Sequence, residues 1–274
     1  MQWSNILRGL LIGVTDLVPG VSGGTVAFIL GIYDRLLEAI SGFFSREWKK
    51  HIGFLIPLAI GVVLALLLFS RLIDYLLETH PEPTQFLFMG LIIGVLPFIF
   101  KEAGAKQNFK SKHIILLIVL AIGMASLAFI KPDETAEAIT SLSGSNVFLL
   151  FIAGWLASMA MLLPGISGSF VLLLIGVYPT AIKALKDLNI PIVLVIGAGV
   201  ILGFIISSKV IRYLLTHFKY MTYAVIIGLI FGSFFIMFPG IPHGAELIAS
   251  ILTFLGGLFF SAWFSSDRFT AKTK

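Results

Sequence analysis

The chain has 274 residues, of which 58% are hydrophobic and only 12% carry a charged side chain. Charged residues make up about a quarter of a typical soluble domain, so this composition excludes a soluble globular protein. The absence of cysteine excludes disulfides, thiolate metal sites and thiol catalysis. We therefore predict an all-α, polytopic membrane protein, and the net charge of +5 bears on its orientation.

The first apolar stretch runs from Ile6 to Val18 and ends at a helix-breaking Pro19-Gly20. Asp16 and Pro19 stand where a signal peptide would need small residues for cleavage, so this stretch belongs to the mature fold. About 13 helical residues cover only ~20 Å of a ~30 Å hydrocarbon core. We therefore predict a re-entrant hairpin, with residues 25–40 as its returning arm, although a pair of full spans remains the alternative.

Six further apolar runs are long enough to cross a membrane. They cover residues 52–69, 85–100, 113–130, 191–207, 220–238 and 247–264. A second hairpin is predicted between the third and fourth runs, because Pro164-Gly165-Ile166-Ser167-Gly168-Ser169 repeats the earlier Pro-Gly-x-Ser-Gly pattern. Its first arm, residues 146–163, is longer than that of the first copy and could span.

The repetition extends beyond the motif. Gly31, Tyr33 and Ala39 recur as Gly176, Tyr178 and Ala184, and later matches pair Ser70, Arg71, Gly90 and Gly94 with Ser208, Lys209, Gly228 and Gly232. Each half then contains one hairpin and three spans, an odd number of crossings, so the halves must have inverted topology. We predict two inverted repeats, residues 1–140 and 141–274, in one membrane domain, as in many transporters.

Lys and Arg residues are concentrated at one end of the predicted spans, on one side of the membrane. One end carries 15 of the 19 Lys and Arg residues, at positions 8, 35, 46, 49, 50, 101, 106, 110, 112, 209, 212, 219, 268, 272 and 274. The opposite end is net acidic. Basic loops are retained on the cytoplasmic side of a membrane, so we expect both termini in the cytoplasm.

Each motif opens a helix with small, hydroxyl-bearing residues. The first amides of a helix lack intrahelical partners, and the positive end of its dipole attracts anions. We predict that the two motif tips meet and bind a phosphate group through Ser22, Gly23, Gly24, Thr25, Ser167, Gly168 and Ser169. Pro19, Gly20, Pro164 and Gly165 provide the helix breaks. The alternative is that the hydroxyls only cap their helices and the glycines only permit close packing.

Charged residues near the motifs are further candidates. Asp16 lies inside an apolar arm, where carboxylates are costly and commonly functional, so it could exchange H⁺ or bind Na⁺; the alternative is a cap on the broken backbone. Five others could guide an anion or only anchor the protein at the lipid headgroups. They are Arg35, Glu38, Arg71, Lys183 and Lys209.

An enzyme is not expected. Gly20-Val21-Ser22-Gly23-Gly24 matches a hydrolase nucleophile elbow, but the second copy breaks the pattern and no histidine lies in either motif or within an apolar span. The sequence also lacks a phosphate loop with lysine, a dinucleotide fingerprint and a metal-binding histidine pair. We predict no cofactor, no metal and no nucleic-acid partner.

Two stretches resemble the PopT family of bacterial polyprenyl-phosphate transporters. They are Asp16-Leu17-Val18-Pro19-Gly20-Val21-Ser22-Gly23-Gly24-Thr25 and Ile29-Leu30-Gly31-Ile32-Tyr33-Asp34-Arg35-Leu36, and Leu163–Ser169 and Gly228–Gly232 also fit. The resemblance covers nearly the whole chain. It implies a multi-pass protein of the bacterial cytoplasmic membrane that returns undecaprenyl phosphate from the outer to the cytoplasmic leaflet for reuse in cell-wall synthesis.

Two other functions stay open from the sequence. One is a cation-coupled transporter of a small or organic anion, and the other is a membrane-embedded lipid-modifying enzyme. The coupling ion, H⁺ or Na⁺, and the formation of a homo-oligomer are likewise left open by the sequence.

Overall fold

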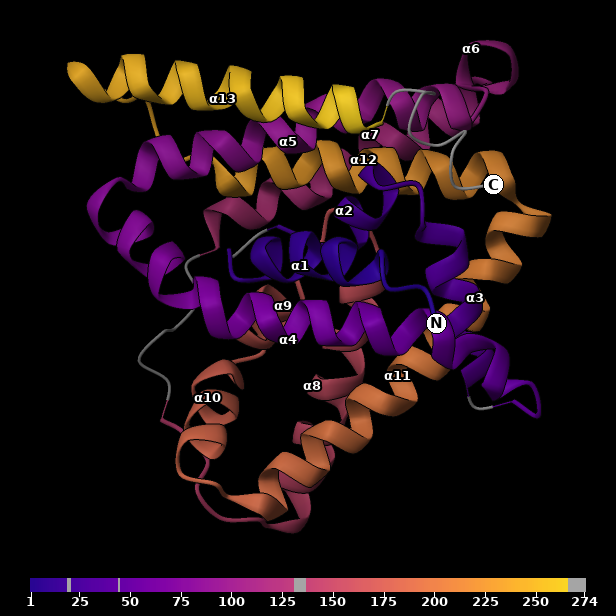
Figure 1. The fold of residues 1–274 in the computed structure, drawn as a ribbon, viewed down its shortest axis with the longest axis vertical. Helices are drawn as coiled ribbons and strands as arrows, with labels where there is room; N and C mark the ends of the chain where they lie inside the picture. Colours follow the sequence, from indigo (N-terminus) through magenta and orange to yellow (C-terminus); the bar gives the residue numbers. More distant parts are fainter. Residues whose placement is uncertain (19–20, 44, 131–136, 266–274) are drawn as a thin grey trace.

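The computed structural model describes all residues except 19–20, 44, 131–136 and 266–274. The described residues form α-helices and one 3₁₀ turn, with no β-strand among them (Figure 1). In chain order the elements are α1 (Asn5–Asp16), α2 (Gly23–Ile29), α3 (Tyr33–Phe43), α4 (Trp48–Thr79), α5 (Pro81–Glu102), α6 (Ala105–Asn108), α7 (Ser111–Ser126), η1 (Leu127–Phe129), α8 (Gly144–Leu162), α9 (Gly168–Leu174), α10 (Tyr178–Lys186), α11 (Ile190–His217), α12 (Lys219–Met237) and α13 (Ala245–Phe264). The predicted all-α architecture is confirmed.

Seven stretches of helix in the described part of the chain are long and apolar enough to cross a membrane. Six overlap the predicted spans: α4, α5, α7 with η1, α11, α12 and α13. The seventh is α8. Large apolar side chains such as Leu67, Ile122, Leu194 and Phe259 project outward from these helices, where a bilayer would cover them. The protein is therefore a multi-pass membrane protein.

The two hairpins differ in length. α1 has 12 residues and α8 has 19, which correspond to about 18 Å and about 28 Å of helix. α1 is thus too short to cross the membrane alone, whereas α8 is long enough. In the second copy the two following helices, α9 and α10, are bent by 112° relative to each other.

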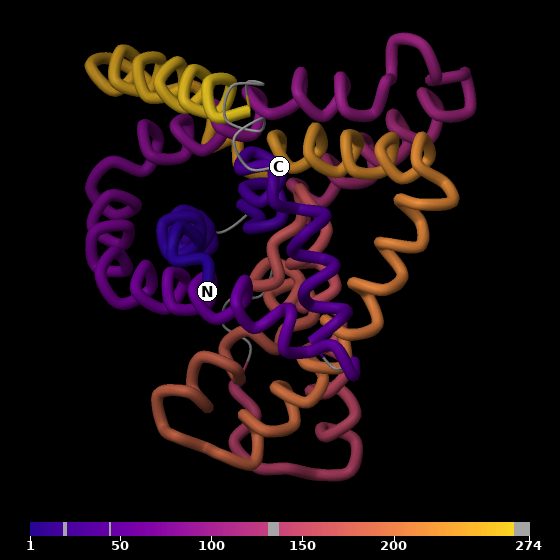
Figure 2. The backbone as a smooth tube through the Cα atoms, turned by 45° about the vertical axis from the view of Figure 1, so that its right-hand side comes forward, coloured from indigo at the N-terminus to yellow at the C-terminus, as the bar shows by residue number. Residues whose placement is uncertain are grey.

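Helix pairing follows one scheme in both halves. α1 packs along α4 as α8 packs along α11, while α5 packs along α13 and α12 along α7. The yellow α13 lies beside α5 in Figure 1 and again in the rotated view of Figure 2. Gly90 and Gly94 of α5 match Gly228 and Gly232 of α12 in the sequence repeat, and α7 and α13 are the next long helices after them. Each predicted half therefore packs its last long helix against the other half. The proposed domain boundary at residue 140 falls between η1 and α8 and stays a prediction.

Close helix contacts depend on glycines that the repeat places at matching positions. A Cβ atom at Gly61 of α4 would collide with the carbonyl oxygen of Ile6 in α1. A Cβ atom at Gly199 of α11 would collide with that of Phe151 in α8. Small residues let membrane helices approach until their backbones touch. The same packing device therefore holds both hairpins to their neighbouring spans.

The first hairpin lies at the centre of the protein. All seven residues of α2 are buried, whereas Gly168 is the one buried residue of α9. Phe28 and Leu37 of the first hairpin belong to one apolar cluster with Phe88 of α5 and Ile226 of α12. The core thus forms around the first copy of the motif, and the second copy packs against it from one side.

Alanine substitution of the two packing glycines tests this arrangement. We expect Gly61→Ala and Gly199→Ala each to destabilise the protein by about 1–3 kcal/mol relative to a control, because the added methyl group overpacks a helix contact. The control is Gly123→Ala in α7, where nothing lies within 4 Å of the new atom and the gain in helix propensity is the same. Thermal unfolding in detergent measures the difference. Equal melting temperatures for all three variants would contradict the packing scheme.

Candidate functional site

The first copy of the motif joins α1 to α2 across a break in the helix. α1 ends at Asp16, and Ser22 is extended just before α2 begins at Gly23. The Asp16 Oδ1 accepts a hydrogen bond of 2.9 Å from the Gly23 N–H, whereas the Ser22 side chain makes no capping bond. Asp16 therefore caps the first turn of α2. Pro19 and Gly20, the predicted break itself, lie outside the described residues.

The second copy has the same course but different chemistry. α8 ends at Leu162, Gly165 has φ +91°, and Ser167 is extended before α9 begins. A φ in that range favours glycine, which explains the Pro164-Gly165 pair. The Ser167 and Ser169 hydroxyls bond to each other at 2.7 Å. Met161 replaces the aspartate here and lies against Gly168, so the two helix starts are not chemically equivalent.

Both short helices end in the same turn. The Gly31 N–H donates to the Phe28 carbonyl and the Ile32 N–H to the Ala27 carbonyl, each at 2.9 Å. Gly176 and Val177 repeat these bonds to the carbonyls of Leu173 and Leu172. Gly31 and Gly176 both have positive φ, and together the bonds form a Schellman cap in each copy. The sequence match at these glycines thus reflects a shared backbone turn.

The two motif tips meet in the interior of the protein. The Ser22 hydroxyl donates to the Leu163 carbonyl at 3.1 Å, and the Tyr33 hydroxyl donates to the Leu162 carbonyl at 2.9 Å. The Gly165 N–H donates to the Thr25 hydroxyl oxygen at 3.0 Å. These three bonds join parts of the chain that are 129 to 141 residues apart. Side chains of the first copy thereby satisfy the broken backbone of the second.

The contact between the tips is tightly packed. Ser22 and Thr25 are only 1% and 2% exposed. A Cβ atom at Gly24 would lie 3.1 Å from the Leu162 carbonyl oxygen and 3.3 Å from the Pro164 nitrogen. A larger residue at this position would therefore push the two tips apart.

The structure brings the predicted phosphate-binding residues together but leaves them bonded to protein. Ser22 and Thr25 bond to the second motif, Gly23 to Asp16, and Ser167 to Ser169. In this conformation the two tips form one closed contact. Phosphate binding by these residues stays a prediction, and it requires the contact to open.

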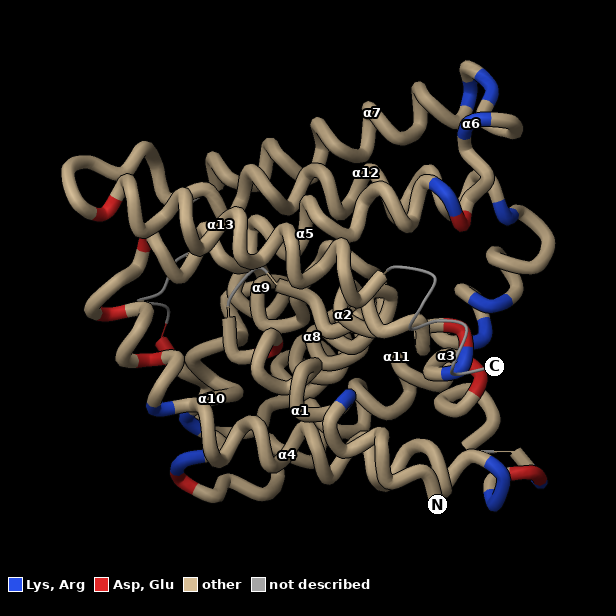
Figure 3. Tube along the Cα trace, turned by 45° about the horizontal axis from the view of Figure 1, so that its top comes forward, with Lys and Arg blue, Asp and Glu red and all other residues tan. Residues whose placement is uncertain are grey.

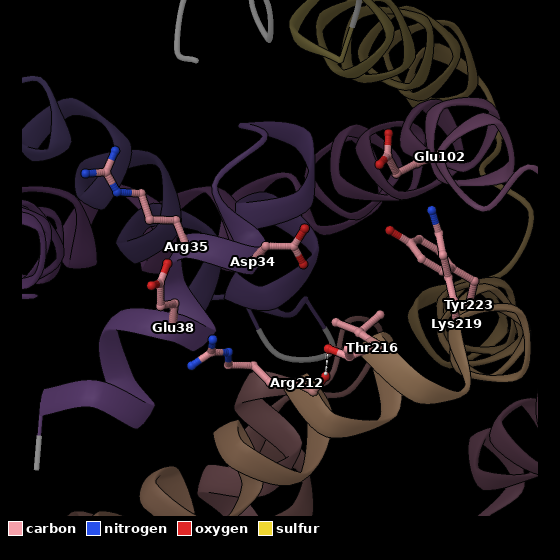
Figure 4. A pocket seen from close by; sticks show the side chains of 9 residues that line it. Asp34, Arg35, Glu38, Glu102, Arg212, Thr216, Lys219 and Tyr223 are labelled. Atoms are coloured by element: carbon pink, nitrogen blue, oxygen red, sulfur yellow. Dashed lines mark hydrogen bonds between the residues drawn. The ribbon is translucent and has the colours of Figure 1, made fainter. Parts of the chain in front are cut away.

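A cavity of about 490 Å³ lies between α3, α5, α11 and α12. Its charged lining residues are Asp34, Arg35, Glu38, Glu102, Arg212 and Lys219 (Figure 4). Thr216 and Tyr223 also line it, and the Thr216 hydroxyl donates to the Arg212 carbonyl at 2.8 Å. The predicted candidates Arg35 and Glu38 therefore belong to one solvent-facing cavity, which lies near the motif tips but outside their contact.

The remaining charged candidates lie apart from this cavity. Lys209 lines a second cavity of about 510 Å³ with Glu38, Arg46 and Arg212. Arg71 in α4 and Lys183 in α10 are exposed and line neither cavity. Arg71 and Lys209 match in the repeat, yet only Lys209 joins a charged cluster.

Sequence reasoning missed most of the 490 Å³ cavity. Asp34, Glu102, Arg212, Lys219 and Tyr223 were not singled out for it, because they come from four helices separated by up to 189 positions. Arg212 and Lys219 counted only as loop charges. A helical projection of α11 and α12 would not have shown that α3 faces them.

Comparison with known proteins agrees with the family resemblance of the motifs. A family model described as undecaprenyl phosphate translocase-like matches residues 12–251. A polyprenyl-phosphate transporter of Staphylococcus aureus is 45% identical over 100% of this chain and 99% of its own length. A polyprenyl-phosphate transporter of Vibrio cholerae is 36% identical over 84% of this chain and 75% of its own.

A more distant relative is an undecaprenyl-diphosphatase of Methanococcus vannielii, 26% identical over 72% of this chain and 77% of its own length. No solved structure gives a significant match. The family suggested by the motifs is the one found, and the chain belongs to the undecaprenyl phosphate translocase-like family.

Proposed function

We propose that this protein transports polyprenyl phosphate, and undecaprenyl phosphate in particular, from the outer to the cytoplasmic leaflet of the bacterial cytoplasmic membrane. The transport would return the lipid carrier for reuse in cell-wall synthesis. One structural observation carries the proposal: two helix breaks meet in the protein interior through bonds whose donors a phosphate group could accept. The relatives named polyprenyl-phosphate transporters support the substrate.

The described conformation is the closed state of this cycle. Opening the contact releases the Ser22 and Thr25 hydroxyls and the Gly165 N–H, each of which can donate to a phosphoryl oxygen. Hydrogen bonds to a charged acceptor are stronger than those to a carbonyl, so the phosphate can compete with the contact between the tips. The headgroup then passes between the halves while the polyprenyl chain stays in the bilayer.

The lipid nature of the substrate fits the energetics. The free-energy cost of moving a phosphate through hydrocarbon without hydrogen bonds is prohibitive. The apolar polyprenyl chain is already stable in the lipid and does not need to leave it. The protein therefore needs a polar path only for the headgroup. The duplicated pairing of α1 with α4 and α8 with α11 supports two inverted halves that exchange access to this path.

Asp16 makes the two motifs chemically different, because only the first motif has a carboxylate at its helix start. Its carboxylate holds the Gly23 N–H at the start of α2, directly beside Ser22, whereas the second copy has no carboxylate there. A phosphate that approaches α2 must compete with this carboxylate, and protonation of Asp16 or a bound Na⁺ would reduce the repulsion. Ion coupling through Asp16 therefore forms part of the proposal.

The orientation follows from the charges. Lys and Arg gather at the end of the protein that includes α3 and α6, while the opposite end is rich in acidic residues (Figure 3). We assign the basic end, and with it both termini, to the cytoplasm.

Single cysteines test the orientation without background, because the chain has none of its own. We expect Asp187→Cys, after α10 at the acidic end, to react with a membrane-impermeant maleimide in intact cells. Lys112→Cys, in α7 at the basic end, should react only after the cells are permeabilised. Labelling of Lys112→Cys in intact cells, with Asp187→Cys unreactive, would reverse the assignment.

A valine at position 25 tests the proposed headgroup site. Thr25→Val keeps the side-chain shape but removes the hydroxyl, and we expect the transport rate to fall about tenfold, since one buried hydrogen bond to a charged group is lost. The assay uses liposomes that carry radiolabelled undecaprenyl phosphate. An impermeant phosphatase outside reports how fast the inner-leaflet lipid becomes accessible.

Thr84→Val is the matched control. Thr84 is 6% exposed, and its hydroxyl donates to the carbonyls of His80 and Leu76 at the junction of α4 and α5, away from the motifs, so its loss should leave transport nearly unchanged. Thr25→Ser should restore activity because it restores the hydroxyl. A folded Thr25→Val protein that transports at the wild-type rate would refute the site.

The distant diphosphatase relative makes a lipid-modifying enzyme the second candidate. The same liposomes, loaded with undecaprenyl diphosphate in place of the phosphate and without added phosphatase, separate the two functions. Release of inorganic phosphate would identify the enzyme, and its absence is expected for a transporter.

A further inference from the structure

The 490 Å³ cavity at the basic end is joined to the motif tips by a row of aromatic rings. Tyr223 lines the cavity, and its ring lies edge-on to Phe28 of α2 with centroids 6.3 Å apart. Phe28 stacks on Tyr33 at 4.1 Å, and the Tyr33 hydroxyl bonds to the Leu162 carbonyl of the second motif. The cavity therefore lies one layer of rings away from the closed contact.

Charges of both signs face this cavity without pairing. The structure shows no ion pair within 4.0 Å between any two of the described charged residues that line the cavity. Burial raises the pKa of the Asp34 carboxyl, Glu102 raises it further, and Lys219 and Arg212 lower it. Unpaired charges around one space leave their hydrogen-bonding capacity available to a ligand.

Lys219 is the cation that lies beside this space, whereas the Arg212 side chain extends toward Glu38 at its edge (Figure 4). Lys219 lies over the ring of Tyr223, 5.7 Å from its centroid, and Arg212 donates to the Ser41 hydroxyl at 2.9 Å. Figure 4 shows Lys219 and the Tyr223 hydroxyl beside the space in front of Asp34. Arg35 is turned away from them and lies over Phe54 instead.

We propose that this cavity is a vestibule that binds the phosphate monoester headgroup on the basic side, before or after its passage through the motif tips. Lys219 and Arg212 attract the headgroup, and the Tyr223 hydroxyl donates to it. This inference rests on the proposed function, for which it names a second headgroup site.

The carboxylates give the vestibule selectivity. The carboxylates of Asp34 and Glu102 offset part of the positive charge of Lys219 and Arg212. The cavity therefore favours binding of an anion of small charge. A phosphate monoester carries about −1.5 to −2 at neutral pH, and a diphosphate ester carries more negative charge. Repulsive groups that penalise a competitor are a common source of specificity. The vestibule therefore favours the monophosphate lipid over the diphosphate lipid.

Protection of Lys219 from acetylation tests both statements on the purified protein. The probes are inorganic phosphate and inorganic pyrophosphate at constant ionic strength, with mass spectrometry as the readout. At several times its Kd, phosphate should slow acetylation of Lys219 about fivefold, and pyrophosphate should protect less. Lys112, which is exposed and lines neither charged cavity, is the internal control and should react at one rate throughout.

Two variants separate attraction from selectivity. Arg212→Gln should abolish protection of Lys219 by phosphate. Glu102→Gln should make pyrophosphate protect at least as well as phosphate, because one repulsive charge is gone. An unchanged melting temperature in detergent shows that each variant is folded.

Lys219 acetylation that is equal with and without phosphate in the wild-type protein would overturn the vestibule. Stronger protection by pyrophosphate than by phosphate would overturn its selectivity. If either result is found together with normal liposome transport, the proposed function is unaffected. Protection of Lys219 by phosphate without transport would contradict the proposed function but not the vestibule.

Discussion

A broken helix inside a membrane must find partners for its free backbone groups within the protein. Lipid offers no hydrogen bonds, so such breaks survive only where protein or trapped water surrounds them. Here the carbonyls of Leu162 and Leu163 and the Gly165 N–H are satisfied by Tyr33, Ser22 and Thr25 of the other motif. The burial of α2 and the central place of the first hairpin follow from this requirement.

The same requirement makes the contact a natural place for transport. When the contact opens, the Ser22 hydroxyl and the Gly165 N–H can donate to a phosphoryl oxygen, whereas the Leu163 carbonyl then needs another donor. A phosphate has enough acceptor oxygens to take several donors at once. In our proposal the closed tips and the charged vestibule are two binding sites for one headgroup, and the Phe28 and Tyr33 rings lie between them.

The sequence was sufficient for the parts of the fold that depend on local pattern. Apolar runs predicted the six spans, and the repeat aligned Gly31 with Gly176, where both copies form the same backbone turn. The second hairpin was harder, because length alone could not separate a re-entrant α8 from a spanning one.

The site was predictable only in part, since its chemistry depends on contacts between distant segments. Ser22 and Thr25 were identified from their motif, but their bonds to the second motif could not be derived from either copy alone. Tyr33 was noticed as a repeat match and not as a hydrogen-bond donor. Glu102, Lys219 and Tyr223 line one cavity with Asp34 because α3, α5, α11 and α12 surround it, an arrangement that no spacing rule reveals.

The central claim is that the protein carries the monophosphate headgroup of a polyprenyl lipid across the membrane. Transport by the purified wild-type protein, measured in liposomes for undecaprenyl phosphate beside undecaprenyl diphosphate, tests it most directly. The account predicts that the monophosphate lipid crosses faster than in protein-free liposomes and that the diphosphate lipid does not. Equal rates with and without the protein for the monophosphate lipid would contradict the account.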